Sequence, residues 1–197
     1  MSPIEGRDTV LNRIRCVLLD RDGTINVSPE RTRYVGDPRD FELEAGVAPA
    51  IAKLNRAGFV VLVVTNQQGI GTGVVTEAAV AQVHDRMQTL LAESGAHVDG
   101  VFTCPHVEGS CDCRKPLPGL LQQALSAWAI DPADAIMVGD AMTDIAAGMA
   151  AGTGVALIGG SAPDGGQAVP RYAALSDLVD DLLVQMTRVD TRDSPKK

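Results

Sequence analysis

A short apolar run that ends in two acidic residues constrains this chain more than any other feature. Val17, Leu18 and Leu19 are consecutive apolar residues, which is typical of a strand buried inside a sheet. Asp20 and Asp22 follow at once, and an open α/β sheet binds its ligands at the carboxyl ends of its strands. Two such carboxylates can divide a reaction, one as nucleophile or metal ligand and the other as general acid. The alternative is an acidic loop that only caps a strand, because so short a motif is common.

Further apolar strands alternate with amphipathic helices along the chain. We expect strands near residues 16–20, 59–65, 101–104, 135–138 and 155–158, and helices near 47–57, 76–94, 118–128, 143–151 and 175–186. We also expect Trp128 on the buried side of its helix and Thr143 as a helix cap. Strands that alternate with helices imply right-handed βαβ units. The predicted fold class is therefore α/β, a three-layer α/β/α Rossmann-like parallel sheet.

Length and charge limit the domain number and the partners. At 197 residues the chain is expected to form one domain over residues 1–190, with a flexible tail over 191–197. The net charge of −8 argues against nucleic acid or an anionic membrane as a partner. Residues 1–15 are charged and lack the apolar segment of a signal peptide, and no apolar run is long enough to span a bilayer. We expect a cytoplasmic monomer.

Three cysteines and a histidine crowd into ten residues. They are Cys104, His106, Cys111 and Cys113. Three thiolates and one imidazole form the ligand set of a closed structural zinc site, with no position left for water. In a reducing compartment such crowding favours a metal over disulfides, although a group of unliganded thiols is the alternative. A metal here would fix the loop just before Arg114 and Lys115 and so aim both basic side chains.

Three other segments place reactive side chains at predicted strand or helix ends. Thr65 and Asn66 follow the second strand, Asp140 and Asp144 follow the fourth, and Lys115 precedes a predicted helix. Taken singly, each has a structural explanation: a polar turn, a helix-capping carboxylate or a solvated lysine. The carboxyl ends of parallel strands share one edge of the sheet, so these side chains can converge with those of the first strand. Convergence is a stronger signal than any one segment.

In these segments the chain resembles the haloacid dehalogenase superfamily of phosphatases. The matching residues are Asp20-Arg21-Asp22-Gly23-Thr24, Thr65-Asn66, Lys115 and Gly139-Asp140 with Asp144, in the superfamily's order and spacing. The resemblance covers about residues 14–160 and implies the haloacid dehalogenase fold.

The resemblance also implies how a phosphate ester would be cleaved. Asp20 would attack phosphorus and become an aspartyl phosphate. Asp22 would protonate the leaving oxygen and later deprotonate the attacking water. Mg²⁺ would be held by Asp20, the main-chain carbonyl of Asp22, and Asp140, because this ion prefers oxygen ligands.

The remaining motif residues would bind the phosphoryl group. Thr65 and the backbone amide of Asn66 would donate to its oxygens, and Lys115 would neutralise the charge that develops on them. Asp144 would cap a helix, support the residues that hold the metal, or contact the metal itself, although Asp140 is better placed at the strand end. By contrast, we expect His84 and His97 to be ordinary surface residues.

Longer matches narrow the resemblance to one subgroup, the D-glycero-D-manno-heptose 1,7-bisphosphate 7-phosphatases and the histidinol-phosphatase domains. The matches are Asp20–Asn26, Thr65–Ile70, Cys104–His106 and Cys111–Pro116. Pro116–Gly119 and Val98–Gly100 favour the heptose enzymes, whereas Gly71-Thr72 favours the histidinol enzymes. Ala141 also departs from the heptose pattern, which has lysine there.

The function implied is removal of the 7-phosphate from heptose 1,7-bisphosphate, a small phosphorylated sugar. Histidinol-phosphate phosphatase is the alternative enzyme, and a non-catalytic sugar-phosphate-binding module is the alternative of another class. The intervals between the motifs are too short for a cap domain with its own core, so a capless, open site is expected. Specificity would then come from short loops, with Asn26, Gln67 and Arg114 as the substrate-binding residues.

Overall fold

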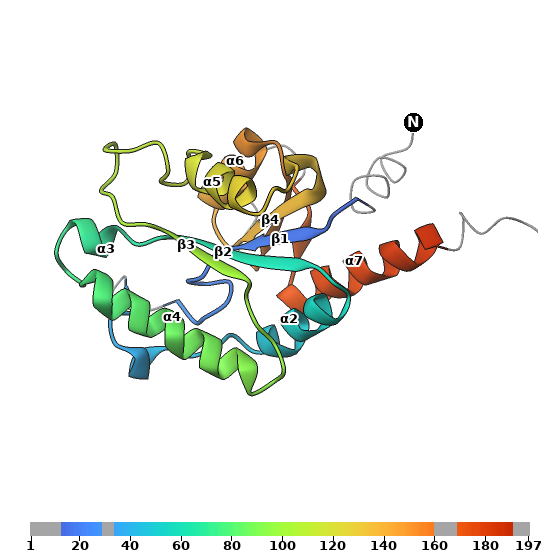
Figure 1. Cartoon of the computed structure of the whole chain (residues 1–197), viewed down its shortest axis with the longest axis horizontal. Helices are drawn as coiled ribbons and strands as arrows, with labels where there is room; N and C mark the ends of the chain where they lie inside the picture. The colour runs from blue at the N-terminus through green and yellow to red at the C-terminus, as the bar shows by residue number, and fades with distance from the viewer. Residues whose placement is uncertain (1–12, 29–33, 160–168, 191–197) are drawn as a thin grey trace, which may run out of the picture.

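The computed structural model describes residues 13–28, 34–159 and 169–190. Figure 1 shows a central sheet with helices on both of its faces. The expected flexible tail over 191–197 and most of the glycine-rich stretch after Gly159 lie outside the described residues. Within those ranges, no helix is both long enough and apolar enough to cross a membrane.

The sheet has six parallel strands. They are β1 (Cys16–Leu19), β2 (Val60–Asn66), β3 (Gly100–Cys104), β4 (Ala135–Gly139), β5 (Gly154–Ile158) and β6 (Arg171–Tyr172). Their spatial order is β3-β2-β1-β4-β5-β6. In the register of the sheet, Leu18 of β1 lies beside Leu62 of β2 and Met137 of β4. Because the chain runs from β1 to β2 on one side and returns to β4 on the other, β1 ends at the switch point where such sheets bind ligands.

The helices are α2 (Val47–Arg56), α3 (Gln68–Gly71), α4 (Glu77–Ala92), α5 (Gly119–Ala127), α6 (Met142–Ala151) and α7 (Leu175–Asp190). Two short 3₁₀ turns occur at Pro38–Asp40 and Pro132–Asp134. Helix α4 begins after Thr76, whose side chain accepts a hydrogen bond from the Ala79 N–H at 3.1 Å, as its capping residue type predicts.

Two apolar cores lie on opposite faces of the sheet. Successive strand residues point to opposite faces, so Val17 and Leu19 enter one core and Leu18 the other. The larger core packs the sheet against α2, α4 and α7, and the smaller one packs it against α5 and α6. Cys104 and Cys113 belong to the smaller core.

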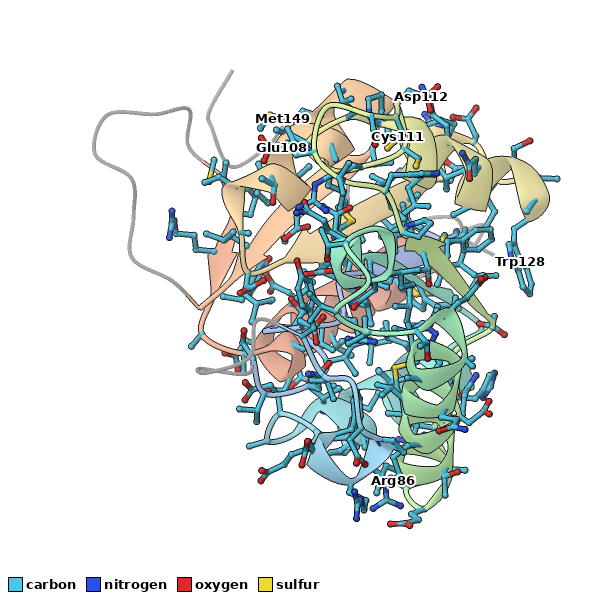
Figure 2. The ribbon with its side chains drawn as sticks, turned by 90° about the vertical axis from the view of Figure 1, so that its left-hand side faces the viewer. Arg86, Glu108, Cys111, Asp112, Trp128 and Met149 are labelled. Atoms are coloured by element: carbon cyan, nitrogen blue, oxygen red, sulfur yellow. The ribbon has the colours of Figure 1, made fainter. Side chains whose placement is uncertain are left out.

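The predicted strands and main helices are confirmed, as is the α/β/α class without a cap, within the residues that the structure describes. Three details were wrong or missed. Trp128 is 40% exposed and points away from the molecule (Figure 2), because α5 ends one residue before it. Thr143 does not cap α6, which begins at Met142. The short elements α3 and β6 carry too few residues for a periodic signal. The domain boundaries at 1 and 190 stay a prediction.

Candidate active site

The turn after β1 places Asp20 at the switch point of the sheet. The N–H of Asp20 donates to the Val138 carbonyl at 2.9 Å, and a tight turn follows that the Gly23 N–H closes onto the Asn26 carbonyl at 2.8 Å. Gly23 has a left-handed φ of +85°, and any side chain there would overlap the carboxylate of Asp140. The glycine therefore lets the Asp140 side chain lie directly against the turn that carries Asp20.

Lys115 joins an acidic side chain from the loop after β1 to one from helix α6. Its Nζ lies 2.7 Å from Asp20 Oδ1, 2.6 Å from Asp144 Oδ1 and 2.8 Å from the Val64 carbonyl oxygen. The lysine is only 3% exposed. Asn66, at the end of β2, binds the lysine's backbone on both sides: its Nδ2 donates to the Lys115 carbonyl at 3.0 Å, and its Oδ1 accepts from the Lys115 N–H at 3.1 Å.

The electrostatics of this cluster leave an excess of negative charge. Burial raises the pKa of Asp20 to about 6 although Lys115 opposes the shift, and burial together with the Asp20 charge raises the pKa of Asp140. Burial by itself would lower the pKa of Lys115, but Asp20 and Asp144 outweigh it and the pKa is raised. One ammonium thus faces three carboxylates, which is an environment that favours a divalent cation.

The donor set fits Mg²⁺. Asp20, Asp140 and Asp144 each offer an oxygen, and these atoms lie within 4.8 Å of one another. Asp144 is already engaged, since its Oδ1 pairs with Lys115 and its Oδ2 accepts from the Ala141 N–H at 3.1 Å. Asp20 and Asp140 are therefore the side chains best suited to hold the ion, which prefers oxygen ligands. Asp144 supports the site through Lys115.

Asp22 is held by three neighbouring side chains. Arg21 donates to both carboxylate oxygens from Nη2, at 3.0 and 2.9 Å, and from Nε at 3.3 Å. Asn26 Nδ2 donates to Oδ1 at 3.0 Å, and Gln67 Nε2 donates to Oδ2 at 2.8 Å. The Asp22 side chain keeps 19% exposure, so part of the carboxylate remains accessible.

The expected substrate contacts of Asn26 and Gln67 do not match their positions. Both residues are completely buried, because their amides turn inward to Asp22. Gln67 also donates to Thr65 Oγ1 at 2.9 Å, which leaves the hydroxyl hydrogen of Thr65 free to point elsewhere. Asn26 therefore holds Asp22, Gln67 holds both Asp22 and Thr65, and neither side chain is exposed.

Arg21 and His84 are site residues that the sequence reasoning missed. Arg21 is fully buried, and its Nη1 lies 3.1 Å from His84 Nε2 on α4. His84 is half-buried against Arg21, so the expectation of an ordinary surface histidine was wrong. Burial and the Arg21 charge lower the pKa of His84 to about 4. His97 is exposed as expected and lies 3.3 Å from Asp99. The only sequence signal was an arginine placed directly after a buried strand, between two carboxylates.

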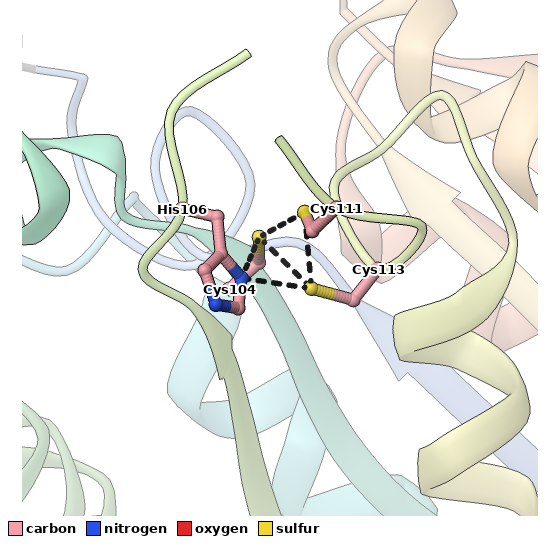
Figure 3. A group of neighbouring side chains, drawn as sticks. All are labelled: Cys104, His106, Cys111 and Cys113. Carbon is pink, nitrogen blue, oxygen red and sulfur yellow. Dashed lines mark hydrogen bonds between the residues drawn. The ribbon is translucent and has the colours of Figure 1, made fainter. Parts of the chain in front are cut away.

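The cysteine cluster closes as predicted (Figure 3). Cys113 Sγ lies 3.3 Å from the sulfurs of Cys104 and Cys111, and 3.2 Å from His106 Nδ1. The Cys104 and Cys111 sulfurs are 3.7 Å apart. Tetrahedral Zn²⁺ with bonds of about 2.3 Å holds its sulfurs at roughly 3.8 Å, so the four donors fit a structural zinc site. Burial, followed by the neighbouring thiols, raises the pKa of Cys113 to about 12.

The loop 104–113, which carries the four candidate zinc ligands, is tied to the segment after β2. The Gln67 N–H donates to the Cys104 carbonyl at 2.8 Å, and the Gly71 N–H donates to the Pro105 carbonyl at 2.9 Å. Gly71 permits this approach, because a Cβ at that position would lie only 2.5 Å from the Pro105 oxygen.

In the view of Figure 2, Cys111 and Asp112 lie at the opposite end of the molecule from Arg86 of α4.

Two features remain beside the cluster for the rest of a substrate. Nη1 of Arg114 is enclosed and has no hydrogen-bond partner within the described residues, which suits an anion or a hydroxyl. A cavity of about 420 Å³ is lined by Asp140 of the cluster together with Thr24, Glu44 and several apolar side chains.

Comparison with known proteins gives consistent results. A haloacid dehalogenase-like hydrolase family model matches residues 30–152. The D-glycero-beta-D-manno-heptose-1,7-bisphosphate 7-phosphatase of Haemophilus influenzae is 40% identical over 144 residues, which are 70% of this chain and 77% of that protein. The protein of the same name from Escherichia coli K12 is 40% identical over 153 residues, 74% of this chain and 78% of its own.

Comparison with solved structures points to the same family of phosphatases. The crystal structure of D,D-heptose 1,7-bisphosphate phosphatase from B. bronchiseptica, complexed with magnesium and phosphate, superposes with a TM-score of 0.79 at 31% identity. The match covers 87% of this chain and 99% of that one. The phosphatase of that name from Burkholderia thailandensis gives 0.66 at 30% identity, over 86% and 98% of the two chains.

Proposed function

Because the chain belongs to the haloacid dehalogenase-like hydrolases, and within them to the D-glycero-beta-D-manno-heptose-1,7-bisphosphate 7-phosphatase family, we propose that it removes the 7-phosphate of this sugar bisphosphate in a Mg²⁺-dependent reaction. The observation that carries the proposal is the contact of Lys115 with Asp20 at the switch point, with Asp140 beside it.

In the first step, a carboxylate oxygen of Asp20 attacks phosphorus and the bond from phosphorus to the O7 oxygen of the sugar breaks. Lys115 holds Asp20 in place and lies where negative charge develops on the phosphoryl oxygens. Thr65 and the Asn66 amide donate to the same oxygens. Asp22 gives its proton to O7, so that the sugar leaves as a neutral alcohol.

In the second step, Asp22 removes a proton from a water molecule, whose oxygen attacks the phosphorus of the phosphorylated Asp20. The bond between phosphorus and the aspartyl oxygen breaks, which frees phosphate and restores the carboxylate. Mg²⁺, when bound, neutralises the charge of the phosphoryl group. Asp20, Asp140 and the main-chain carbonyl of Asp22 would hold it.

Arg114 is the proposed contact to the distant part of the substrate. Its enclosed and unpaired Nη1 supports this assignment, since a buried guanidinium nitrogen without an acceptor carries an energetic cost that an anionic oxygen would relieve. Asn26 and Gln67 serve the reaction indirectly, through Asp22.

We further propose that the protein works as a monomer in a reducing compartment such as the cytoplasm. The four cysteines are free thiols, which suits metal binding in such a compartment. Asp20, Lys115, Asp140 and Asp144 already converge within a single chain. Light scattering of the purified protein tests the monomer; a stable dimer would contradict it.

The direct test of the function is phosphate release in the presence of Mg²⁺. Both anomers of the heptose 1,7-bisphosphate are compared with histidinol phosphate. We expect a large preference in kcat/KM for the heptose substrate. A preference for histidinol phosphate would overturn the substrate, and binding without phosphate release would indicate a non-catalytic module.

Asp20→Asn is the matched inactive variant, because it keeps the shape of the side chain and removes the nucleophile. Its activity should fall by more than about 10³-fold, while its circular dichroism spectrum stays that of the wild type. Retained turnover would refute the aspartyl-phosphate mechanism.

A further inference from the structure

A chain of contacts leads from helix α4 to the proposed acid, Asp22. His84, on α4, lies with its Nε2 3.1 Å from Nη1 of Arg21. The other edge of the same guanidinium, Nε and Nη2, contacts the two oxygens of Asp22 at 2.9–3.3 Å. His84 and Arg21 are 63 residues apart in the sequence, so only the tertiary fold brings them together.

The chemistry of the two side chains sets the direction of the contact. An arginine has five N–H donors and no acceptor, so His84 Nε2 must accept and its hydrogen must sit on Nδ1. Burial and the adjacent positive charge lower the pKa of His84 to about 4, which keeps the ring neutral at physiological pH. A neutral imidazole is the form that can accept this bond.

The guanidinium transmits this constraint because it is flat and rigid. Holding Nη1 at His84 fixes the plane of the group and therefore the edge that faces Asp22. Without an acceptor at His84, the completely buried Nη1 would lose this partner and the group would gain freedom to turn. Asn26 and Gln67 hold the carboxylate from other directions, so Asp22 would be loosened but not released.

We propose that His84 is a positioning residue that acts through Arg21 to aim the carboxyl group of Asp22 at the leaving oxygen. The inference rests on the proposed function, because Asp22 acts as an acid only in that reaction. His84 itself touches no reacting atom.

A substrate pair separates positioning of the acid from a general structural role. A sugar alkoxide is a poor leaving group and needs a proton, whereas the 4-nitrophenolate of 4-nitrophenyl phosphate leaves without one. Attack of water on the phosphorylated Asp20 also uses Asp22 and is common to both substrates, so the two are compared at the first step, transfer of the phosphoryl group to Asp20 in a single turnover. Misplacement of Asp22 should slow this step with the heptose substrate and spare it with the aryl phosphate. Damage to the fold or to Asp20 should slow both.

The variants are His84→Leu, which is similar in size and has no acceptor, and His84→Gln, whose Oε1 can still accept from Arg21. General acid catalysis contributes about 10²–10⁴-fold, so we expect His84→Leu to lower the single-turnover rate for the heptose substrate by about 10–100-fold, with KM within about twofold. Its single-turnover rate of 4-nitrophenolate release should change by less than about threefold, and His84→Gln should restore most of the heptose rate.

His97→Leu is the matched control, since it makes the same change at an exposed histidine. It should behave as the wild type with both substrates. Asp22→Asn removes the acid altogether, so its rate gives the largest loss that misplacement of Asp22 could cause. If His84→Leu fails to fold, Arg21→Lys replaces it in the test. Lysine keeps the positive charge but lacks the planar guanidinium that contacts His84 and Asp22 together. The same selective loss of rate with the heptose substrate is expected.

Equal losses with both substrates at the first step, or a His84→Gln variant as slow as His84→Leu, would overturn the positioning role. Wild-type protein that releases no phosphate from the heptose substrate would instead refute the proposed function, so the two failures are distinguishable.

Discussion

Replacement of Lys115 by methionine removes the cation from the buried carboxylate cluster and nearly keeps the length of the side chain. Lys115 Nζ contacts Asp20, Asp144 and the Val64 carbonyl at 2.6–2.8 Å, and the residue is 3% exposed. Asp144 is 1% exposed and cannot regain water, whereas the Asp20 side chain is 14% exposed. The variant therefore strands one deeply buried carboxylate and one that is partly solvated.

The expected loss of stability follows from these contacts. Breaking a buried ion pair by removing one partner costs about 3–5 kcal/mol. For a chain of this size, 1 kcal/mol shifts Tm by about 2–4 °C. We expect Tm of Lys115→Met to fall by about 6–20 °C in buffer without Mg²⁺, measured by calorimetry with the zinc site loaded. Phosphatase activity should fall as well, because the charge that faces the phosphoryl group is lost.

The loss should depend on pH in a defined direction. In the wild type the pKa of Asp20 is raised to about 6, chiefly by burial, with Lys115 opposing the shift. Without the lysine this pKa rises further above its unfolded value, so the folded variant binds protons that the unfolded chain does not. The variant therefore gains stability relative to the wild type as pH falls. The Tm gap between the two should be larger at pH 8 than at pH 5.

A lysine of similar local geometry but different burial provides the control. Lys53 lies 2.6 Å from Asp180, with side-chain exposures of 40% and 60%. Exposed pairs contribute about 0–1 kcal/mol, so Lys53→Met should shift Tm by less than about 4 °C. A Lys115→Met variant as stable as this control, or a Tm gap that is equal at both pH values, would refute the reasoning.

Three further predictions concern other parts of the site. Gly23→Ala should raise the Mg²⁺ concentration for half-maximal activity by about 10-fold or more, because its Cβ would displace Asp140; unchanged Mg²⁺ dependence contradicts this. Asn66→Ala should cost about 1–3 kcal/mol in urea unfolding and lower kcat, since it removes both bonds to the Lys115 backbone; an unaltered kcat argues against that role. Cys113→Ser should reduce bound zinc from one ion per chain towards zero by atomic absorption and lower Tm; full zinc content would exclude Cys113 as a ligand.

Much of the fold was predictable because its signals are local. Each main strand is a short apolar run. The register of β1 with β2 and β4 could not be predicted, because every residue of β1 and β4 is buried and an unbroken apolar run has no alternation to set it. The missed elements are those with weak local signals. The strand β6 has two residues, and α3 has four, including two glycines. Trp128 was misplaced because an apolar residue at helical spacing does not reveal where the helix ends.

The site was predictable to the extent that it lies at strand ends. Asp20, Lys115 and Asp140 come together because parallel strands share an edge, which can be reasoned without coordinates. The inward orientation of Asn26 and Gln67 could not be predicted from the sequence. A side-chain amide at the start of a loop can donate a hydrogen bond to a substrate or to a neighbouring carboxylate equally well. The link between His84 and Arg21 depends on how α4 crosses the sheet, and the helical spacing of His84 carries no information about it.

The unequal cores on the two faces of the sheet have a consequence for local opening of the molecule. On the face with the smaller core, which α5 and α6 cover, the candidate zinc ligands Cys104 and Cys113 are themselves part of the apolar cluster. A metal bound to these cysteines would compensate for the smaller number of apolar contacts on this face. Regions with few buried apolar contacts open first in amide hydrogen exchange. Without zinc, α5 and the loop before it should exchange early while α2 and α4 remain protected, so the protein would lose its catalytic edge long before it unfolds.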